Sequence, residues 1–105
     1  MEKVIFKSQV LDYFDELVFT LFKKEYFSFP ENAKEYVDKI VGFVTAEIFA
    51  FPHKKTPKSL QYLGSNYIFY KSNSRTAWYI FFEKRENNFL ITGVINNHCE
   101  EAKEL

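Results

Sequence analysis

The chain has 105 residues and no net charge, with 14 Lys and Arg against 14 Asp and Glu, and 47% of its residues are hydrophobic. This length suffices for one domain with its own core, and the aromatic-rich composition excludes a disordered chain. The single cysteine, Cys99, excludes an intramolecular disulfide and is typical of a protein in a reducing compartment. No segment has the length and apolarity needed to cross a bilayer and the N-terminus lacks the pattern of a secretory signal, so we expect a cytoplasmic protein that does not enter a membrane.

The first half of the chain predicts a short strand followed by two helices. The strand is expected at Lys3–Phe6, and Ser8 is a plausible N-cap for the first helix. Pro30 and Asn32 interrupt the helical pattern and precede the second helix. Apolar residues recur at helical spacing in both segments: Val10, Phe14, Leu17, Val18, Leu21 and Phe22 in the first, and Ala33, Tyr36, Val37, Ile40, Val44 and Ile48 in the second. Two such helices form a helical hairpin, and their aromatic residues belong to its apolar seam.

The second half predicts a loop and then a sheet. The stretch "FPHKKTPKSLQYLGSN", which begins at Phe51, has two prolines, a glycine and several basic side chains and predicts a loop or an irregular lead-in to the sheet. Strands are expected at Tyr67–Ser72, Thr76–Lys84 and Phe89–Asn96, joined by short polar turns. This order predicts an α+β fold in which a helical hairpin packs on a three- to four-stranded antiparallel sheet, with the other face of the sheet left for solvent or a partner.

Side chains along the middle strand are expected to alternate between two faces of the sheet. Thr76, Trp78, Ile80 and Phe82 share one face, and Ala77, Tyr79, Phe81 and Glu83 share the other. The first set is the more apolar, so it is expected to face the core and to leave Tyr79 on the exposed face. The residues that we expect to be buried in the whole chain include Phe14, Leu17, Leu21, Tyr36, Ile40, Val44, Trp78, Ile80, Ile91 and Val94.

The charge is distributed unevenly along this neutral chain. Residues 1–52 hold six Lys and Arg against nine Asp and Glu, residues 53–99 hold seven against two, and residues 100–105 hold one against three. The stretch from His53 to Phe82 contains no acidic residue. A local excess of cations attracts an anionic partner even when the molecule is neutral. The alternative is a solvated face without a partner.

The order of the elements, together with "LQYLG", "YIFYKSNSRTAWYIFFE" and "LITGVINNH", resembles the RelE/ParE toxin superfamily of bacterial type II toxin–antitoxin modules. The resemblance covers nearly the whole chain and is most suggestive from Lys54 to His98. It implies a toxin that a cognate antitoxin protein holds inactive. RelE-like members cut messenger RNA in the decoding site of the ribosome, whereas ParE-like members share the fold and poison DNA gyrase.

RNA cleavage of this kind needs no metal and no cofactor, because the 2′-hydroxyl attacks the adjacent phosphate. The enzyme must remove a proton from that hydroxyl, neutralise charge on the phosphoryl oxygens and protonate the leaving oxygen. Arg75 suits the charge-neutralising role, His98 can act as acid or base near neutral pH, and Tyr79 can donate a proton or stack on a base. The residues expected to bind RNA or phosphate are Lys54, Lys55, Lys58, Tyr70 and Lys71.

Each catalytic candidate also has a structural explanation. Tyr79 can be a cross-strand packing residue, and Arg75 can be an ordinary surface arginine in a turn. His98 can belong to the cap of a terminal helix that "NNHCEEAKEL" begins, with Asn97 as the N-cap. A zinc site would have only His53, His98 and Cys99 as familiar ligands, without paired spacing.

One departure from the family pattern bears on catalysis. RelE-like nucleases typically place a tyrosine near the C-terminus among their basic catalytic residues, and no tyrosine follows Tyr79 here. Either His98 takes that role or the chemistry is absent. The alternatives to a nuclease are therefore a ParE-like gyrase poison and a non-catalytic protein-binding module of the same fold.

Overall fold

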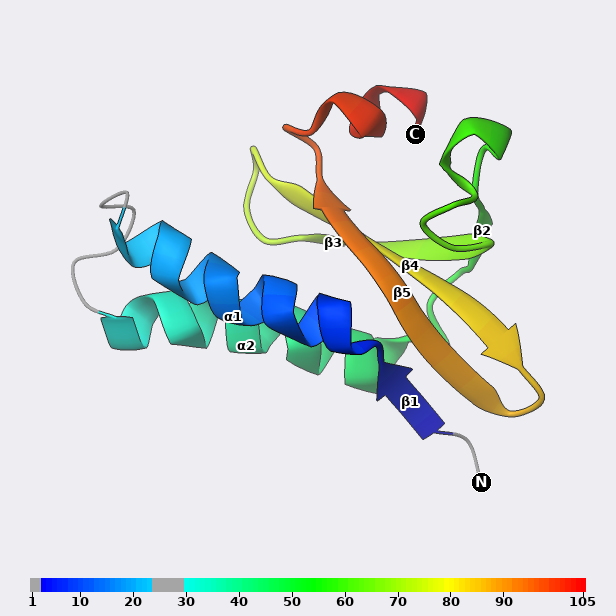
Figure 1. Ribbon diagram of the computed structural model, residues 1–105, viewed down its shortest axis with the longest axis horizontal. Coiled ribbons are helices and arrows are strands. Elements are labelled where there is room, and N and C mark those ends of the chain that lie inside the picture. The colour runs from blue at the N-terminus through cyan, green and yellow to red at the C-terminus, as the bar shows by residue number, and fades with distance from the viewer. Residues whose placement is uncertain (1–2, 24–29) are drawn as a thin grey trace.

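The protein has an α+β fold in which two helices pack against one face of a five-stranded sheet (Figure 1). The computed structural model describes the backbone of residues 3–23 and 30–105 and the side chains of residues 3–20 and 32–105. None of the described helices is long and apolar enough to cross a membrane. The elements are, in chain order, β1 (Lys3–Phe6), α1 (Ser8–Lys23), α2 (Pro30–Glu47), β2 (Lys54–Lys55), the 3-10 helix η1 (Lys58–Leu60), β3 (Asn66–Lys71), β4 (Ala77–Arg85), β5 (Asn88–Asn96) and the 3-10 helix η2 (Glu100–Glu104).

The sheet differs from the expected one in two respects. Its strand order is β1-β5-β4-β3-β2, and β1 pairs with β5 in parallel while the other pairs are antiparallel. The prediction of three to four strands, all antiparallel, was therefore wrong. Helices α1 and α2 bring the chain back toward the end of the sheet at which β1 begins. The turns between β3 and β4 and between β4 and β5 each reverse the chain, so that β5 runs in the same direction as β1. The fifth strand is β2, which pairs with the start of β3 and is too short to produce an alternating pattern in the sequence.

The main core lies between the helices and the sheet, as the sequence predicts. Val10 and Phe14 of α1, and Val37, Ile40 and Val44 of the expected apolar stripe of α2, pack in one core with Ile68, Trp78 and Ile80 of the sheet. Of the ten residues expected to be buried, six are buried: Phe14, Ile40, Val44, Trp78, Ile80 and Ile91. Leu17, Tyr36 and Val94 are half-buried against the same core, and the side chain of Leu21 lies outside the described residues.

The opposite face of the sheet carries a second, smaller apolar cluster. Tyr67, Phe81 and Ile95 are buried there, and Phe81 is fully inaccessible to solvent. The segments around η1 and η2 fold over this side, and Leu63, Cys99, Ala102 and Leu105 pack against the cluster. The expectation that this whole face is left for solvent or a partner was therefore wrong, because two short 3-10 segments cover part of it.

A tight backbone approach fixes the segment after η1 on the sheet. The hydroxyl of Thr92 donates a hydrogen bond to the Leu63 carbonyl oxygen at 2.5 Å, beside a register shift in the β4–β5 pairing. Gly64 has a φ of +156°, and a Cβ atom placed on it would lie 2.8 Å from the backbone nitrogen of Phe82. Only glycine accommodates both the dihedral angle and the close approach.

We expect Gly64→Ala to lower the free energy of unfolding by about 2 kcal/mol, because strain at a glycine-favoured φ adds to a clash with backbone that cannot move aside. The matched control is Gly42→Ala in α2, where nothing lies within 4 Å of the added atom. That change should raise stability by roughly 0.5 to 1 kcal/mol, as alanine does in a helix interior. Urea unfolding of both variants measures the difference, and equal effects of the two changes would contradict the assigned close approach.

Candidate functional site

The strand register gathers basic and aromatic side chains on the face of β2, β3 and β4 that lies opposite the helices. Lys54 pairs with Tyr67, Phe69 with Tyr79, and Lys71 with Ala77. Residues directly opposite each other in an antiparallel pair project from the same face, and alternate residues of one strand share a face. We call this surface the outer sheet face, and its residues are Lys54, Tyr67, Phe69, Lys71 and Tyr79.

Contacts within the outer sheet face hold its aromatic rings in place. The Lys54 ammonium lies 5.4 Å from the centroid of the Phe69 ring, at cation–π distance. The rings of Tyr67 and Tyr79 are 6.0 Å apart in an edge-to-face arrangement. Burial raises the pKa of the Tyr67 phenol above its ordinary value, and the nearby Tyr79 phenol adds a smaller effect in the same direction. The Tyr67 phenol is therefore neutral at physiological pH.

Acidic side chains contribute little to this face. Glu83 projects from the same side of β4, but its carboxylate accepts a hydrogen bond from the Ser65 backbone N–H at 3.1 Å. Lys54 and Lys71 are exposed, whereas Phe69 and Tyr79 are half-buried. The arrangement offers two separated cations flanking partly exposed rings, which suits a phosphate backbone with unpaired bases.

Arg75 lies at the tip of the β3–β4 hairpin, in a turn that asparagine side chains hold. The Asn73 side-chain oxygen accepts from the Arg75 backbone N–H at 2.8 Å. The Asn97 side chain donates to the Arg75 carbonyl oxygen at 3.0 Å and accepts from the Ala77 N–H at 3.1 Å. The exposed Arg75 side chain thus extends from a backbone segment fixed on both sides.

His98 follows β5 and lies beside the same hairpin. Its Nε2 atom is 3.5 Å from the Thr76 hydroxyl, and its backbone N–H donates to the Asn96 side-chain oxygen at 2.9 Å. The cap predicted for a terminal helix is not formed by Asn97. The residue at the N-cap of η2 is Cys99, which makes no side-chain capping hydrogen bond. The Asn97 side chain does not cap η2, because its oxygen accepts a hydrogen bond from the Ala77 N–H of β4.

The structure does not bring all eight sequence-predicted site residues together. Arg75 and His98 lie at the same end of the sheet, with His98 in contact with Thr76, the neighbour of Arg75 in the sequence, and Lys54, Lys71 and Tyr79 share the outer sheet face. Three residues lie elsewhere. Lys55 pairs with Asn66 and so projects from the opposite face, Lys58 is exposed on η1, and Tyr70 packs on Phe43 of α2 with ring centroids 4.9 Å apart.

His98 and Tyr79 also lie on different sides of the sheet. Thr76, which contacts His98, falls on the helix-facing side with Trp78, whereas Tyr79 belongs to the outer sheet face. The three catalytic candidates therefore do not form a single contacting cluster. A common substrate would have to pass around the hairpin tip to meet all three.

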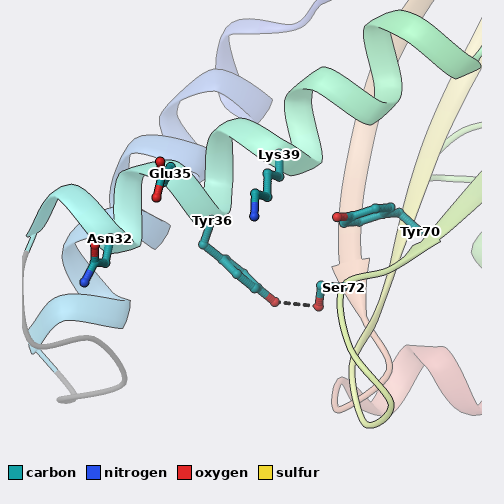
Figure 2. Close-up of a pocket in the computed structure, with 6 residues that line it drawn as sticks. All are labelled: Asn32, Glu35, Tyr36, Lys39, Tyr70 and Ser72. Carbon is teal, nitrogen blue, oxygen red and sulfur yellow. Dashed lines mark hydrogen bonds between the residues drawn. The ribbon is translucent and has the colours of Figure 1, made fainter.

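Tyr70 instead lines a cavity that the sequence did not predict. The cavity has a volume of about 320 Å³ and lies between α2 and the β3–β4 hairpin (Figure 2). Its lining residues are Asn32, Glu35, Tyr36, Lys39, Tyr70 and Ser72. The sequence pattern assigned Tyr36 to the apolar stripe of its helix and gave Lys39 no role, because a single lysine three residues on from a tyrosine carries no specific signal.

No protein-family model, no curated protein and no solved structure matches this chain. Among the described residues, the structure contains no group of three or more His, Cys, Asp or Glu side chains that could hold a metal ion. The free Cys99 packs beside the smaller apolar cluster.

We expect Asn97→Asp to loosen the hairpin tip, because a carboxylate can still accept from the Ala77 N–H but cannot donate to the Arg75 carbonyl. The decrease should be about 1 to 2 kcal/mol in unfolding free energy, with faster amide exchange confined to residues 73–77. Asn88→Asp at the other end of β5 is the control. Unchanged exchange at the tip in Asn97→Asp would show that the asparagine does not hold the turn.

Proposed function

We propose that this protein is a toxin of a bacterial type II toxin–antitoxin module and acts in the cytoplasm as a metal-independent RNA endonuclease on ribosome-bound messenger RNA. The sequence resemblance to the RelE/ParE superfamily suggests the class, and the helical hairpin on a sheet is compatible with it. The observation that carries the proposal is the outer sheet face, where Lys54 and Lys71 flank Phe69 and Tyr79 and the Arg75 turn lies at the end.

The proposed binding mode follows from the spacing of these groups. Lys54 and Lys71 lie at opposite ends of the face, so each can contact a different phosphate of one strand. Phe69 and Tyr79 between them offer ring surface for unpaired bases, which are the form of RNA that proteins read. A duplex would not present its bases in this way, and the proposal therefore specifies single-stranded RNA.

In the proposed reaction, the 2′-hydroxyl of one nucleotide loses its proton and attacks the following phosphate, and the 5′-oxygen of the next nucleotide leaves with a proton. Arg75 stabilises the charge on the phosphoryl oxygens, since its planar fork can bind two of them. His98, at the neighbouring strand end, exchanges a proton with the attacking or the leaving oxygen. Tyr79 supports a base on the outer sheet face instead of acting at the phosphate.

A non-catalytic role is the competing proposal, and one observation favours it. Tyr79 packs edge-to-face on Tyr67 and lies across the sheet from the contact between His98 and Thr76. Candidate residues on opposite sides of the sheet suit binding of a partner over a broad surface better than catalysis at a single phosphate. In that case the target is a protein such as DNA gyrase, and the antitoxin is still the cognate partner.

Arg75→Ala should relieve the growth arrest that induced expression of the toxin causes. Removing a group that stabilises the phosphate in the transition state costs about 3 kcal/mol, or about a hundredfold in rate, while an exposed turn arginine contributes little to the core. Arg85→Ala at the far end of β4 is the matched control, since the chain has only these two arginines. Primer-extension mapping of messenger RNA, beside a gyrase supercoiling assay, reads out each activity. Full toxicity and RNA cleavage in folded Arg75→Ala would eliminate the catalytic assignment.

His98→Gln tests the proposed proton transfer separately. If His98 is the acid or base, the variant should lose one limb of the pH dependence of RNA cleavage, because histidine is the group that titrates near neutral pH. The glutamine can still contact the Thr76 hydroxyl, so a purely structural role predicts an unchanged profile. The measurement is the single-turnover cleavage rate of ribosome-bound messenger RNA across pH.

A further inference from the structure

The cavity between α2 and the β3–β4 hairpin is separate from the outer sheet face. Tyr70 and Ser72 reach it from β3 and the turn that follows, and Tyr36 and Lys39 reach it from α2 (Figure 2). Its open space of about 320 Å³ is large enough for a phosphate group with part of a nucleoside attached. The side chains around it are mostly polar, which indicates a polar ligand.

Four polar ends point toward one another in this cavity. Figure 2 shows the Lys39 ammonium and the Tyr70 hydroxyl facing the space above the hydrogen-bonded pair of Tyr36 and Ser72. Asn32 and Glu35 complete the lining from α2, and both lie farther from Tyr70 than Lys39 does. The part of the cavity between α2 and β3 is therefore lined by the Lys39 ammonium and by the Tyr36, Tyr70 and Ser72 hydroxyls, which can all donate hydrogen bonds, while Glu35 contributes the one carboxylate of the lining.

The Lys39 and Tyr70 groups are available to a ligand. Among the described residues, no carboxylate lies within the 4.0 Å of an ion pair from Lys39, whereas Lys34 on the same helix pairs with Asp38 at 3.0 Å. The Tyr70 hydroxyl likewise has no hydrogen-bond partner in the described part of the chain, although its ring is packed on Phe43. The ring is thus fixed while its hydroxyl is open to the cavity.

Ser72 can supply a third donor at little cost. The Trp78 indole N–H donates to the Tyr36 hydroxyl at 3.0 Å, and the Tyr36 and Ser72 hydroxyls share a hydrogen bond of 2.7 Å. The Ser72 hydroxyl reaches the Thr76 carbonyl only at 3.4 Å, and that carbonyl already accepts from the Ser72 backbone N–H at 3.0 Å. Turning the Ser72 hydroxyl toward a ligand therefore leaves no buried acceptor unsatisfied.

We propose that this cavity is a phosphate-binding site, in which the Lys39 ammonium provides the charge and the Tyr70 and Ser72 hydroxyls donate hydrogen bonds to the phosphate oxygens. Ser72 belongs to the same turn as Arg75, so the ligand is a phosphate of the RNA strand that passes the hairpin tip. This identification of the source rests on the proposed function, whereas phosphate binding itself does not. The other source of the same group is a free phosphomonoester.

Trp78 reports occupation of the site because it is the only tryptophan and its N–H contacts the Tyr36 hydroxyl. The titration follows the Trp78 indole N–H signal by NMR at constant ionic strength, with inorganic phosphate in one arm and the dinucleotide ApA in the other. Saturable shifts in at least one arm are expected. Tighter binding of ApA identifies an RNA strand as the source, and tighter binding of inorganic phosphate identifies a phosphomonoester.

Lys39→Gln should weaken binding about tenfold, as expected when a charged hydrogen-bond donor is removed, and Ser72→Ala should weaken it less. Lys34→Gln, on the same helix, is the matched control and should bind as the wild type does. No saturable shift in the wild type, or equal weakening by Lys34→Gln and Lys39→Gln, would overturn the site. Binding is measured without RNA cleavage, so a failed nuclease assay leaves this result intact, and a failed titration leaves the Arg75 test intact.

Discussion

Strand β4 must satisfy two apolar layers at once, and the other features of the fold depend on that constraint. Trp78, Ile80 and Phe82 pack against the helices, while Phe81 is buried in the smaller cluster on the opposite side. A shift of one residue in register would exchange these two sets, and it would place Glu83 against the helices. The central position of β4 in the strand order thus fixes which side chains of its neighbours face which layer.

Burial on both sides leaves the margins of the sheet for the charged residues. Lys54 lies on the edge strand, Lys71 at the end of β3, and Arg75 in the turn beyond it. Lys54 and Lys71 project from the outer sheet face, whereas Lys39 of α2 lies in the cavity on the helix side of the β3–β4 hairpin. The positive charge of residues 53–99 does not form one flat patch. Its seven side chains are spread over the edge strand, η1, the β3–β4 turn and the far end of β4: Lys54, Lys55, Lys58, Lys71, Arg75, Lys84 and Arg85.

The sequence predicts the fold well where a periodic pattern is long. The helix stripe and the alternation in β4 were confirmed, because repeated apolar positions signal burial independently of the rest of the chain. Pairing between distant segments has no such local signal. The sequence did not predict three features that depend on contacts between distant segments. These are the parallel pairing of β1 with β5, the two-residue strand at Lys54, and the packing of the 3-10 segments over Phe81.

The same limit explains which residues the sequence could place next to one another. Arg75 precedes the strand expected at Thr76–Lys84 and His98 follows the strand expected at Phe89–Asn96, and the antiparallel register of β4 and β5 brings these two segments close together. Lys39 was missed because its partners, Tyr70 and Ser72, lie more than thirty residues further along the chain. A cavity formed by a helix and a distant strand has no sequence spacing that could identify it.

The hairpin tip is held from both sides, and this rigidity favours a role in which the position of Arg75 matters. Asn97 secures the backbone on the side of β5, and the hydrogen bonds between Ser72 and Thr76 close the turn itself. A guanidinium that must meet a phosphate at one defined point gains from such restraint, because the entropy of ordering the backbone is lost during folding and not during binding. The polar contacts at the tip therefore fix the backbone from which the Arg75 side chain extends, which the proposed phosphate-directed role requires.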